Sequence, residues 1–272
     1  MSLHTAISET FDSPRSPGVG SAISSEFIKL VSVPRQRALL LGAIGAAALM
    51  AVVFYVSLPV TQGRSLGELS PGEILGAGML GVDAAAFVLV ILAAIHVGSE
   101  YSTGMIQATL IITPARGRVL VGKFATVAAT ALAVGAIAAA VCVAAAVIAG
   151  GAVGLDPSRI LTGAGIRLAL GSIAMPVLYA VIAASAAFVC RSAVLGMAIP
   201  LAVMAVGGLA GWFGDSFSAL LTPLMPVAAI HSLSGVATGH ESIGIAGAAV
   251  SILAWLAVSI GAAAWHLLRR DA

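Results

Sequence analysis

The residues whose spacing most suggests chemistry lie in the stretch GRVLVGKF, from Gly117 to Phe124. Gly117, Gly122 and Lys123 have the spacing of a phosphate-binding loop, in which backbone N–H groups and a lysine hold phosphates. Such a loop follows a buried strand and closes on a Ser or Thr that binds Mg²⁺. Here the sequence Pro-Ala-Arg precedes the stretch, and Phe124 occupies the hydroxyl position. The stretch therefore indicates the boundary of an apolar segment rather than a nucleotide site.

The composition is that of a membrane protein. Of the 272 residues, 60% are hydrophobic and 9% are charged, and the mean hydropathy is +1.10. A soluble domain carries about 25% charged residues. The 13 basic and 11 acidic residues are too few and too scattered for a nucleic-acid surface. Cys142 and Cys190 both lie in apolar runs, which makes a disulfide framework or a zinc site an unfavourable interpretation.

Long stretches without charged residues, called windows below, predict an all-α membrane protein with six transmembrane helices. A spanning helix needs about 20 mostly apolar residues. Two windows meet at Cys190-Arg191-Ser192, where a tight turn is expected. Residues 1–20 are rich in Ser, Pro and Gly and predict a disordered cytoplasmic tail. Residues 21–272 are predicted to form one transmembrane domain, with spans at about 38–60, 74–97, 118–150, 165–190, 193–213 and 243–267.

The window between Asp215 and Glu241 is not counted as a span. Pro223 and Pro226 would break a helix that must satisfy its own backbone hydrogen bonds in lipid. With six spans, ten of the 13 basic residues fall on one side, and only Arg64, Arg159 and Arg167 fall on the other. The positive-inside rule then places both termini in the cytoplasm. Residues 215–241 are expected to form short, broken helices that dip back into the outer leaflet.

Residues 21–37 precede the first span and carry an amphipathic pattern. Ile23, Phe27, Leu30 and Val31 recur at helical spacing, and Pro34 separates them from the span. This pattern predicts a helix that lies in the membrane interface. The alternative is a plain cytoplasmic extension of the first span.

Residues 98–123 join the second and third spans on the cytoplasmic side. Ser99 and Glu100 can begin a short helix, apolar residues around Met105 and Leu110 give it one face, and Pro114 ends it. A helix that leaves the membrane and returns is a natural docking element for a soluble partner.

The chain resembles the permease subunits of type-2 ABC exporters. SEFIKLVSVPRQ is similar to the S-E-x-x-K-L-x-S start of those subunits, and EYSTGMIQATLIITPARGRVLVGK is similar to their segment between spans two and three. The six spans and the Pro-containing TPLMPVAA before the last span extend the resemblance over most of residues 22–272. Ile112-Thr113 departs from the polar or basic residues that are common before Pro114.

The resemblance implies an elbow helix before span one, a coupling helix after span two and re-entrant helices between spans five and six. It also implies a homodimer or homologous heterodimer in a bacterial plasma membrane, with two separate ATPase subunits that hold the ATP and Mg²⁺, so that no cofactor is expected on this chain. Removing Glu100 should uncouple hydrolysis from export. The elbow residues are Glu26, Phe27, Lys29 and Leu30, and the coupling residues are Glu100, Tyr101, Gly104, Ile106, Leu110, Pro114 and Arg116.

Two charges fall inside predicted spans. Asp83 lies about nine residues, or roughly 13 Å, into its span, and Arg167 lies at a compatible depth near the outer end of another. Buried ionisable groups are costly unless they are paired or face water. Either the two pair as a strut, or Asp83 faces the transport pathway and contacts a cationic substrate. The apolar spans suit a hydrophobic or amphipathic cargo such as a drug, antibiotic, peptide or lipid.

Two other classes of protein were weighed. An intramembrane enzyme would need a catalytic constellation in the bilayer, yet Asp83 is the only acid within a predicted span and the histidines have no metal-ligand spacing. A secondary transporter would favour inverted repeats and more buried charges, and no repeat is visible. Dependence of transport on an ATPase subunit would separate the exporter from both.

Overall fold

The computed structural model describes residues 18–112 and 115–269, and every regular element in these ranges is helical. The predicted tail, residues 1–20, lies outside the described residues except at its end, where the first helix begins at Val19. The α-helices are α1 (Val19–Ser32), α2 (Pro34–Thr61), α3 (Pro71–Ser102), α4 (Met105–Ile112), α5 (Arg116–Ala152), α6 (Pro157–Ile160), α7 (Gly163–Ser172), α8 (Ala174–Cys190), α9 (Ala193–Leu209), α10 (Asp215–Leu221), α11 (Pro226–Ser234) and α12 (Gly244–Arg269). Short 3₁₀ turns lie at Leu66–Glu68, Ala210–Phe213, Thr222–Leu224 and Gly239–Glu241.

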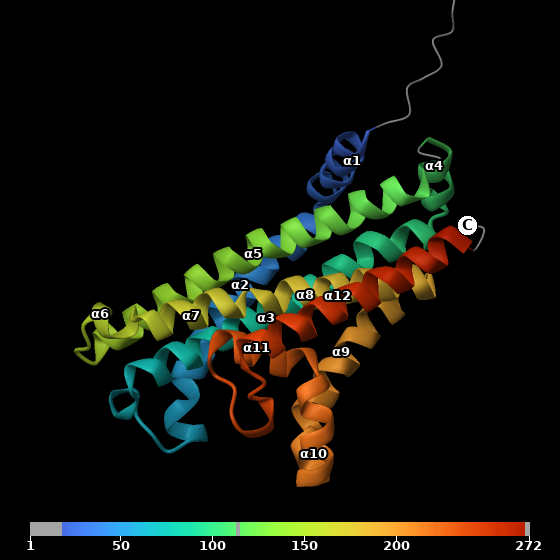
Figure 1. Ribbon diagram of the computed structural model, residues 1–272. Coiled ribbons are helices and arrows are strands. Elements are labelled where there is room, and N and C mark those ends of the chain that lie inside the picture. The colour runs from blue at the N-terminus through green and yellow to red at the C-terminus, as the bar shows by residue number, and fades with distance from the viewer. Residues whose placement is uncertain (1–17, 113–114, 270–272) are drawn as a thin grey trace, which may run out of the picture.

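Among the described residues, five helical segments are long and apolar enough to cross a membrane: α2, α3, α5, the α7–α8 pair and α12. The bent pair Asp215–Leu224 and Pro226–Ser234 would make a sixth if it is one span. The predicted span 193–213 forms the shorter α9 and a 3₁₀ turn. Figure 1 shows the long helices side by side, with α4 and the C-terminal end of α12 at one end of the bundle and α6 at the other. The five long segments make the chain a multi-pass membrane protein.

Proline and side-chain caps set where the first two spans begin. Pro34 is the first residue of α2, where its missing N–H has no intrahelical partner to lose. Val33 before it is extended, which confirms the predicted separation of α1 from the first span. The α3 helix begins with a capping box, in which Ser70 Oγ accepts from the Glu73 N–H and Glu73 Oε2 accepts from the Ser70 N–H at 2.8 Å. These caps start both helices three or four residues before the predicted spans.

The fourth predicted span, 165–190, is interrupted at Ile173, between α7 and α8. Pro176 lies four residues after Ser172, so it cannot donate a helical hydrogen bond to the Ser172 carbonyl, and its ring crowds that carbonyl. The helix resumes and ends at Cys190, and Arg191 adopts a left-handed conformation with φ of 51°. The predicted tight turn at residues 190–192 is therefore confirmed.

Residues 215–241 form short helices, as predicted. The segment Asp215–Leu224 and the helix Pro226–Ser234 meet at an angle of 77°. Met225 between them is extended, and Pro226 is the first residue of α11. Figure 1 shows α10 projecting away from the bundle while α11 lies against it. Whether this segment enters the membrane stays a prediction.

The α3 helix is the centre of the bundle and packs against α2, α5, α8 and α9. Small residues such as Ala43, Ala47, Ala85 and Ala138 are fully buried and allow the helices to approach closely. In contrast, α2 and α12 present large apolar residues outward, as expected for surfaces that face lipid. These exposed residues include Leu41, Leu49, Val52, Val56, Ile245, Val250, Leu253 and Val258.

Candidate functional site

A cluster of charged side chains joins α1, α3 and α5 at the α4 end of the bundle. Lys123 Nζ of α5 lies 2.7 Å from Glu26 Oε2 of α1 and 2.8 Å from Glu100 Oε1 of α3. Lys29 of α1 lies 2.7 Å from Glu26 Oε1 and 2.9 Å from Glu100 Oε1. Two carboxylates thus hold two ammonium groups across three helices. This set of four residues, Glu26, Lys29, Glu100 and Lys123, is called the ionic cluster below.

The ionic cluster is almost completely closed to solvent. Lys123 is 0% exposed, Glu26 and Glu100 are buried, and only Lys29 reaches the surface. His96 Nε2 of α3 lies 3.2 Å from Glu26 Oε2. Burial raises the pKa of Glu26, but His96, Lys123 and Lys29 outweigh it and hold that pKa well below its usual range. Burial lowers the pKa of Lys29, but Glu26 and Glu100 reverse this and raise it. Glu26 and Lys29 are therefore held in their charged forms at the edge of the buried cluster.

Small side chains place α1 close enough to α5 for these contacts. A Cβ atom added at Gly122 would lie 3.3 Å from the Ala22 Cβ, so glycine permits the close approach. Thr126 Oγ1 donates to the Ile23 carbonyl at 3.4 Å. On α1, Ala22, Glu26 and Leu30 are buried at helical spacing, while Phe27 stays exposed. The predicted apolar stripe of α1 is therefore divided: Leu30 packs into the protein beside Glu26, whereas Phe27 and Val31 are exposed.

The stretch Gly117 to Phe124, whose residue spacing matches a phosphate-binding loop, is helical. Residues 117–124 all lie within α5, which begins at Arg116. Lys123 is buried as the shared counter-ion of Glu26 and Glu100. Its position at the inner boundary of the third span stays a prediction. Phe124, next in the chain, packs on Phe188 with ring centroids 5.8 Å apart.

The C-terminal end of α3 packs on the start of α9. A Cβ atom at Gly98 would lie 2.5 Å from Ala193 Cα and 2.8 Å from Ala193 Cβ. Tyr101 makes an edge contact with Phe188 at 6.3 Å, and the Arg191 guanidinium lies 6.0 Å from the Tyr101 ring. These contacts fix the end of α3 from the side opposite α1.

We expect Gly98→Ala to lower the free energy of unfolding by about 1–3 kcal/mol, because the new methyl overpacks against backbone. Gly76→Ala, in the same helix with nothing within 4 Å of the new Cβ, is the matched control. It should be neutral or stabilise by up to about 1 kcal/mol, since alanine favours helix. Melting temperatures of both variants in one detergent make the comparison, and equal values would contradict the close packing seen at Gly98.

The α4 helix presents an apolar surface outward. Ile106 is buried against the bundle, whereas Ile111 is 79% and Met105 is 52% exposed. Gly104, with φ of 72°, makes the turn between α3 and α4 that a side chain would strain. Glu100 lies one helical turn before this glycine. The ionic cluster therefore fixes the end of α3 from which α4 continues. The side chain of Leu110 and the whole of Pro114 lie outside the described residues.

Arg116, the first residue of α5, ties the same end of the bundle to α12. Its Nη1 donates to the Leu267 carbonyl at 3.1 Å. Leu267 is in the last turn of α12, where carbonyls lack helical partners and a cation is favourable. Of the predicted coupling residues, Glu100, Tyr101, Ile106 and Arg116 therefore make contacts that hold α3, α4, α5 and α12 together.

The structure does not bring Asp83 and Arg167 together. Arg167 of α7 donates from Nη2 to the Ser232 carbonyl at 2.7 Å and from Nε to the Leu233 carbonyl at 3.0 Å. It thereby holds the C-terminal end of α11. No ion pair or hydrogen bond to the Asp83 carboxylate occurs within residues 18–112 and 115–269. The structure therefore does not contain the Asp83–Arg167 ion pair that was one of the two alternatives.

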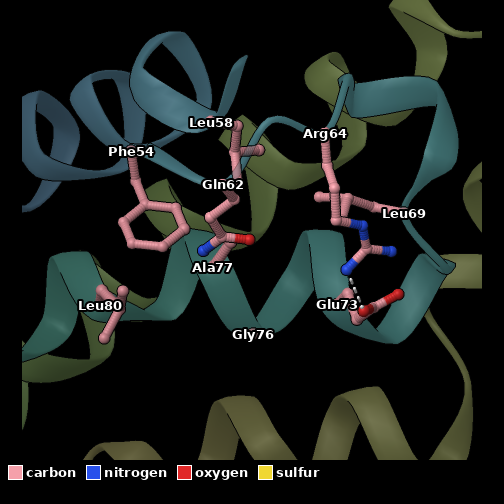
Figure 2. Close-up of a pocket in the computed structure, with 9 residues that line it drawn as sticks. All are labelled: Phe54, Leu58, Gln62, Arg64, Leu69, Glu73, Gly76, Ala77 and Leu80. Carbon is pink, nitrogen blue, oxygen red and sulfur yellow. Dashed lines mark hydrogen bonds and ion pairs between the residues drawn. The ribbon is translucent and has the colours of Figure 1, made fainter. Parts of the chain in front are cut away.

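A further cavity of about 280 Å³ lies between α2 and α3 at the end away from α4. Figure 2 shows Arg64 pointing toward Glu73 across it, with Phe54, Leu58 and Leu80 as apolar walls. The Arg64 Nη1–Glu73 Oε1 distance is 2.9 Å, and both side chains are exposed. An exposed pair of this kind contributes little stability. The described residues hold no group of three or more His, Cys, Asp or Glu side chains placed to bind a metal ion.

The comparison with known proteins identifies the family. Residues 22–208 match the family described as ABC-2 family transporter protein. The match covers well over half of the chain and includes α1, the ionic cluster, α4 and the helices from α2 to nearly the end of α9. The chain therefore belongs to the ABC-2 transporter family, whose members are the membrane components of transporters. No curated protein matches the chain at a significant level.

His96 and the role of Lys123 were missed by sequence reasoning. The signal was present, because Glu26 and Lys29 lie in the first family-like stretch and Glu100 and Lys123 bound the second. Two stretches that each carry one acid and one base are candidates to neutralise one another. Only the packing of α1 on α5 shows that they do.

Proposed function

We propose that the chain is the permease subunit of an ATP-driven exporter in a bacterial plasma membrane, with both termini in the cytoplasm. Two copies, or this chain and a homologous one, form the pathway, and two separate ABC ATPase subunits hold the ATP and Mg²⁺. No cofactor is assigned to this chain. The cargo is a hydrophobic or amphipathic compound. The observation that carries this proposal is the exposed apolar face of α4, rooted in the ionic cluster.

The geometry suits the transmission of motion from a soluble partner. A subunit that docks on Met105 and Ile111 would push on α4, which has a short connection to α3 at Gly104. The ionic cluster joins the end of α3 to α1 and α5, so the three helices move as one body. ATP binding by the partner can then shift the pathway between inward and outward access, provided ATP and cargo bind the two states with different affinities.

The docking face is tested with Ile111→Asp, which places a charge in the proposed contact. Co-expressed with its cognate ABC ATPase subunit, this variant should lose copurification of the ATPase and ATP-dependent transport in proteoliposomes. A loss of about 30-fold or more in affinity is expected, since hot-spot substitutions cost about 2 kcal/mol or more. Leu161→Asp is the matched control, because Leu161 is an exposed leucine at the α6 end of the bundle.

Two results would contradict the docking face. The first is an Ile111→Asp chain that retains the ATPase as well as the Leu161→Asp chain does. The second is transport by the wild-type chain that proceeds from an ion gradient without ATP, which would assign the chain to secondary transport. Gel filtration of both variants shows whether they are folded.

A further inference from the structure

Asp83 lies where two cavities meet in the middle of the bundle. The first, of about 300 Å³, is lined by α3, α8, α9 and α11, and the second, of about 220 Å³, by α3, α7, α8 and α11. Asp83 and Met175 line both. Asp83 lies twelve residues, or roughly 18 Å, along α3 from Pro71, far from either end of that helix. Asp83 is half-buried and lies midway along a predicted span, beside both cavities.

The larger cavity also contains a hydroxyl group with no partner. Tyr179 of α8 lines it, is 0% exposed, and its Oη has no hydrogen-bond partner among the described residues. A buried hydroxyl without a partner costs free energy, so such a group calls for an explanation. The other walls are apolar and flexible: Phe87, Leu201, Met204 and Val227. Methionines of this kind adapt to ligands of different shape.

Among the described residues, no basic side chain forms an ion pair with the Asp83 carboxylate. Arg167, the basic residue expected to pair with it, is engaged by the Ser232 and Leu233 carbonyls. His231 faces Asp83 from the smaller cavity, but its Nδ1 lies 2.8 Å from Glu241 Oε2. A lone carboxylate in the membrane interior is expensive unless it faces water or binds a cation. The missing partner can therefore come from a ligand.

We propose that the cavity bounded by Asp83 and Tyr179 binds organic monocations, with the positive charge at the Asp83 carboxylate and the apolar body against Phe87, Leu201 and Met204. A tertiary or quaternary ammonium or phosphonium group meets this chemistry, and a ligand hydrogen-bond acceptor or an entering water satisfies the Tyr179 hydroxyl. The cavity volume is at the lower end of those that hold drug-sized ligands. The biological meaning rests on the proposed function, since the site would select amphipathic cations as cargo.

The test uses the purified full chain alone in detergent, without an ATPase subunit. Tetraphenylphosphonium and tetraphenylborate have similar shapes and opposite charges, and each is titrated separately by calorimetry. The wild-type chain should bind the cation with a Kd at least about tenfold below its Kd for the anion. Asp83→Asn should weaken cation binding by about tenfold or more and remove the preference for the cation. Tyr179→Phe should leave the Kd within about twofold, because tetraphenylphosphonium has no hydrogen-bond acceptor for the Tyr179 hydroxyl.

Glu73→Gln, which removes a carboxylate from the exposed end of the same helix, is the control and should leave the Kd within about twofold. Asp83→Glu keeps the charge and should retain the preference if Asp83→Asn does not fold. The proposal is overturned if the wild-type chain shows no cation preference or if Asp83→Asn leaves the wild-type Kd unchanged. Where Asp83→Asn does not fold, it is overturned if Asp83→Glu binds the cation and the anion equally. Failure of this test leaves the α4 docking result untouched, and loss of ATPase docking leaves cation binding measurable.

Discussion

Replacing Lys123 with methionine should lower the free energy of unfolding by about 3–5 kcal/mol, which is the cost of leaving a buried charge without its partner. Methionine fills similar space, so loss of packing contributes little. The substitution leaves Glu26 and Glu100 buried with Lys29 as their only strong counter-ion. Because Lys29 is partly exposed, it cannot balance both carboxylates away from solvent. The α1 helix should detach from α5 before the bundle unfolds.

The measurement is thermal unfolding in detergent, followed by tryptophan fluorescence, with Lys29→Met as the control. Lys29 contacts the same two carboxylates, but Lys123 and solvent remain beside them when it is lost, so a cost of about 1–2 kcal/mol is expected. Lys123→Arg keeps the charge and should recover part of the loss. A Lys123→Met chain as stable as Lys29→Met would show that the buried pairs contribute nothing beyond surface pairs.

Glu100→Gln is expected to separate ATP hydrolysis from transport. The neutral amide cannot balance Lys123 and Lys29, so the end of α3 loses its attachment to α1 and α5 while α4 keeps its exposed face. The ATPase subunit should still dock and hydrolyse ATP, but the motion would no longer reach the spans. Transport per ATP hydrolysed should fall by about tenfold, within the 5–150-fold range of typical coupling energies.

The ratio is measured in proteoliposomes that contain the permease and its ATPase, with transport and phosphate release recorded on the same sample. Glu73→Gln again provides a carboxylate change in the same helix, and it should leave the ratio unchanged. Unaltered cargo-stimulated hydrolysis together with unaltered transport in Glu100→Gln would remove Glu100 from the coupling path. A fall in hydrolysis and transport in equal proportion would instead indicate loss of docking.

Much of the architecture could be predicted from the positions of charges and prolines. Stretches without charged residues predicted the long helices. Pro34 predicted the break after α1, and the charge at Arg191 predicted the turn between α8 and α9. These features are local, since each depends on the burial cost of a charge or on the geometry of one residue. The length of α3 was underestimated because its Ser70 cap begins the helix before the apolar core, whereas the span predicted at 193–213 was overestimated, since α9 ends at Leu209.

The contacts between distant charges could not be predicted in the same way. Depth along a span was known for Asp83 and Arg167, but depth does not fix the direction in which a helix turns its side chains. Arg167 donates hydrogen bonds to carbonyls at the C-terminal end of α11, and the position of α11 depends on the 77° bend. The ionic cluster likewise depends on how α1 folds back on α5. Tertiary packing, rather than sequence pattern, decides these pairings.

The ionic cluster also orders the biosynthesis of the chain. Glu26 and Glu100 are made before Lys123, so the ribosome delivers both acids well before their buried base. Until α5 emerges, neither α1 nor the end of α3 has the partner that makes burial favourable. Lys29 contacts the same two carboxylates, so α1 and the end of α3 can associate through it before α5 is made. The buried pairs form only when α5 packs on both helices, and Lys123 is thus the last of the four charges of the ionic cluster to be synthesised.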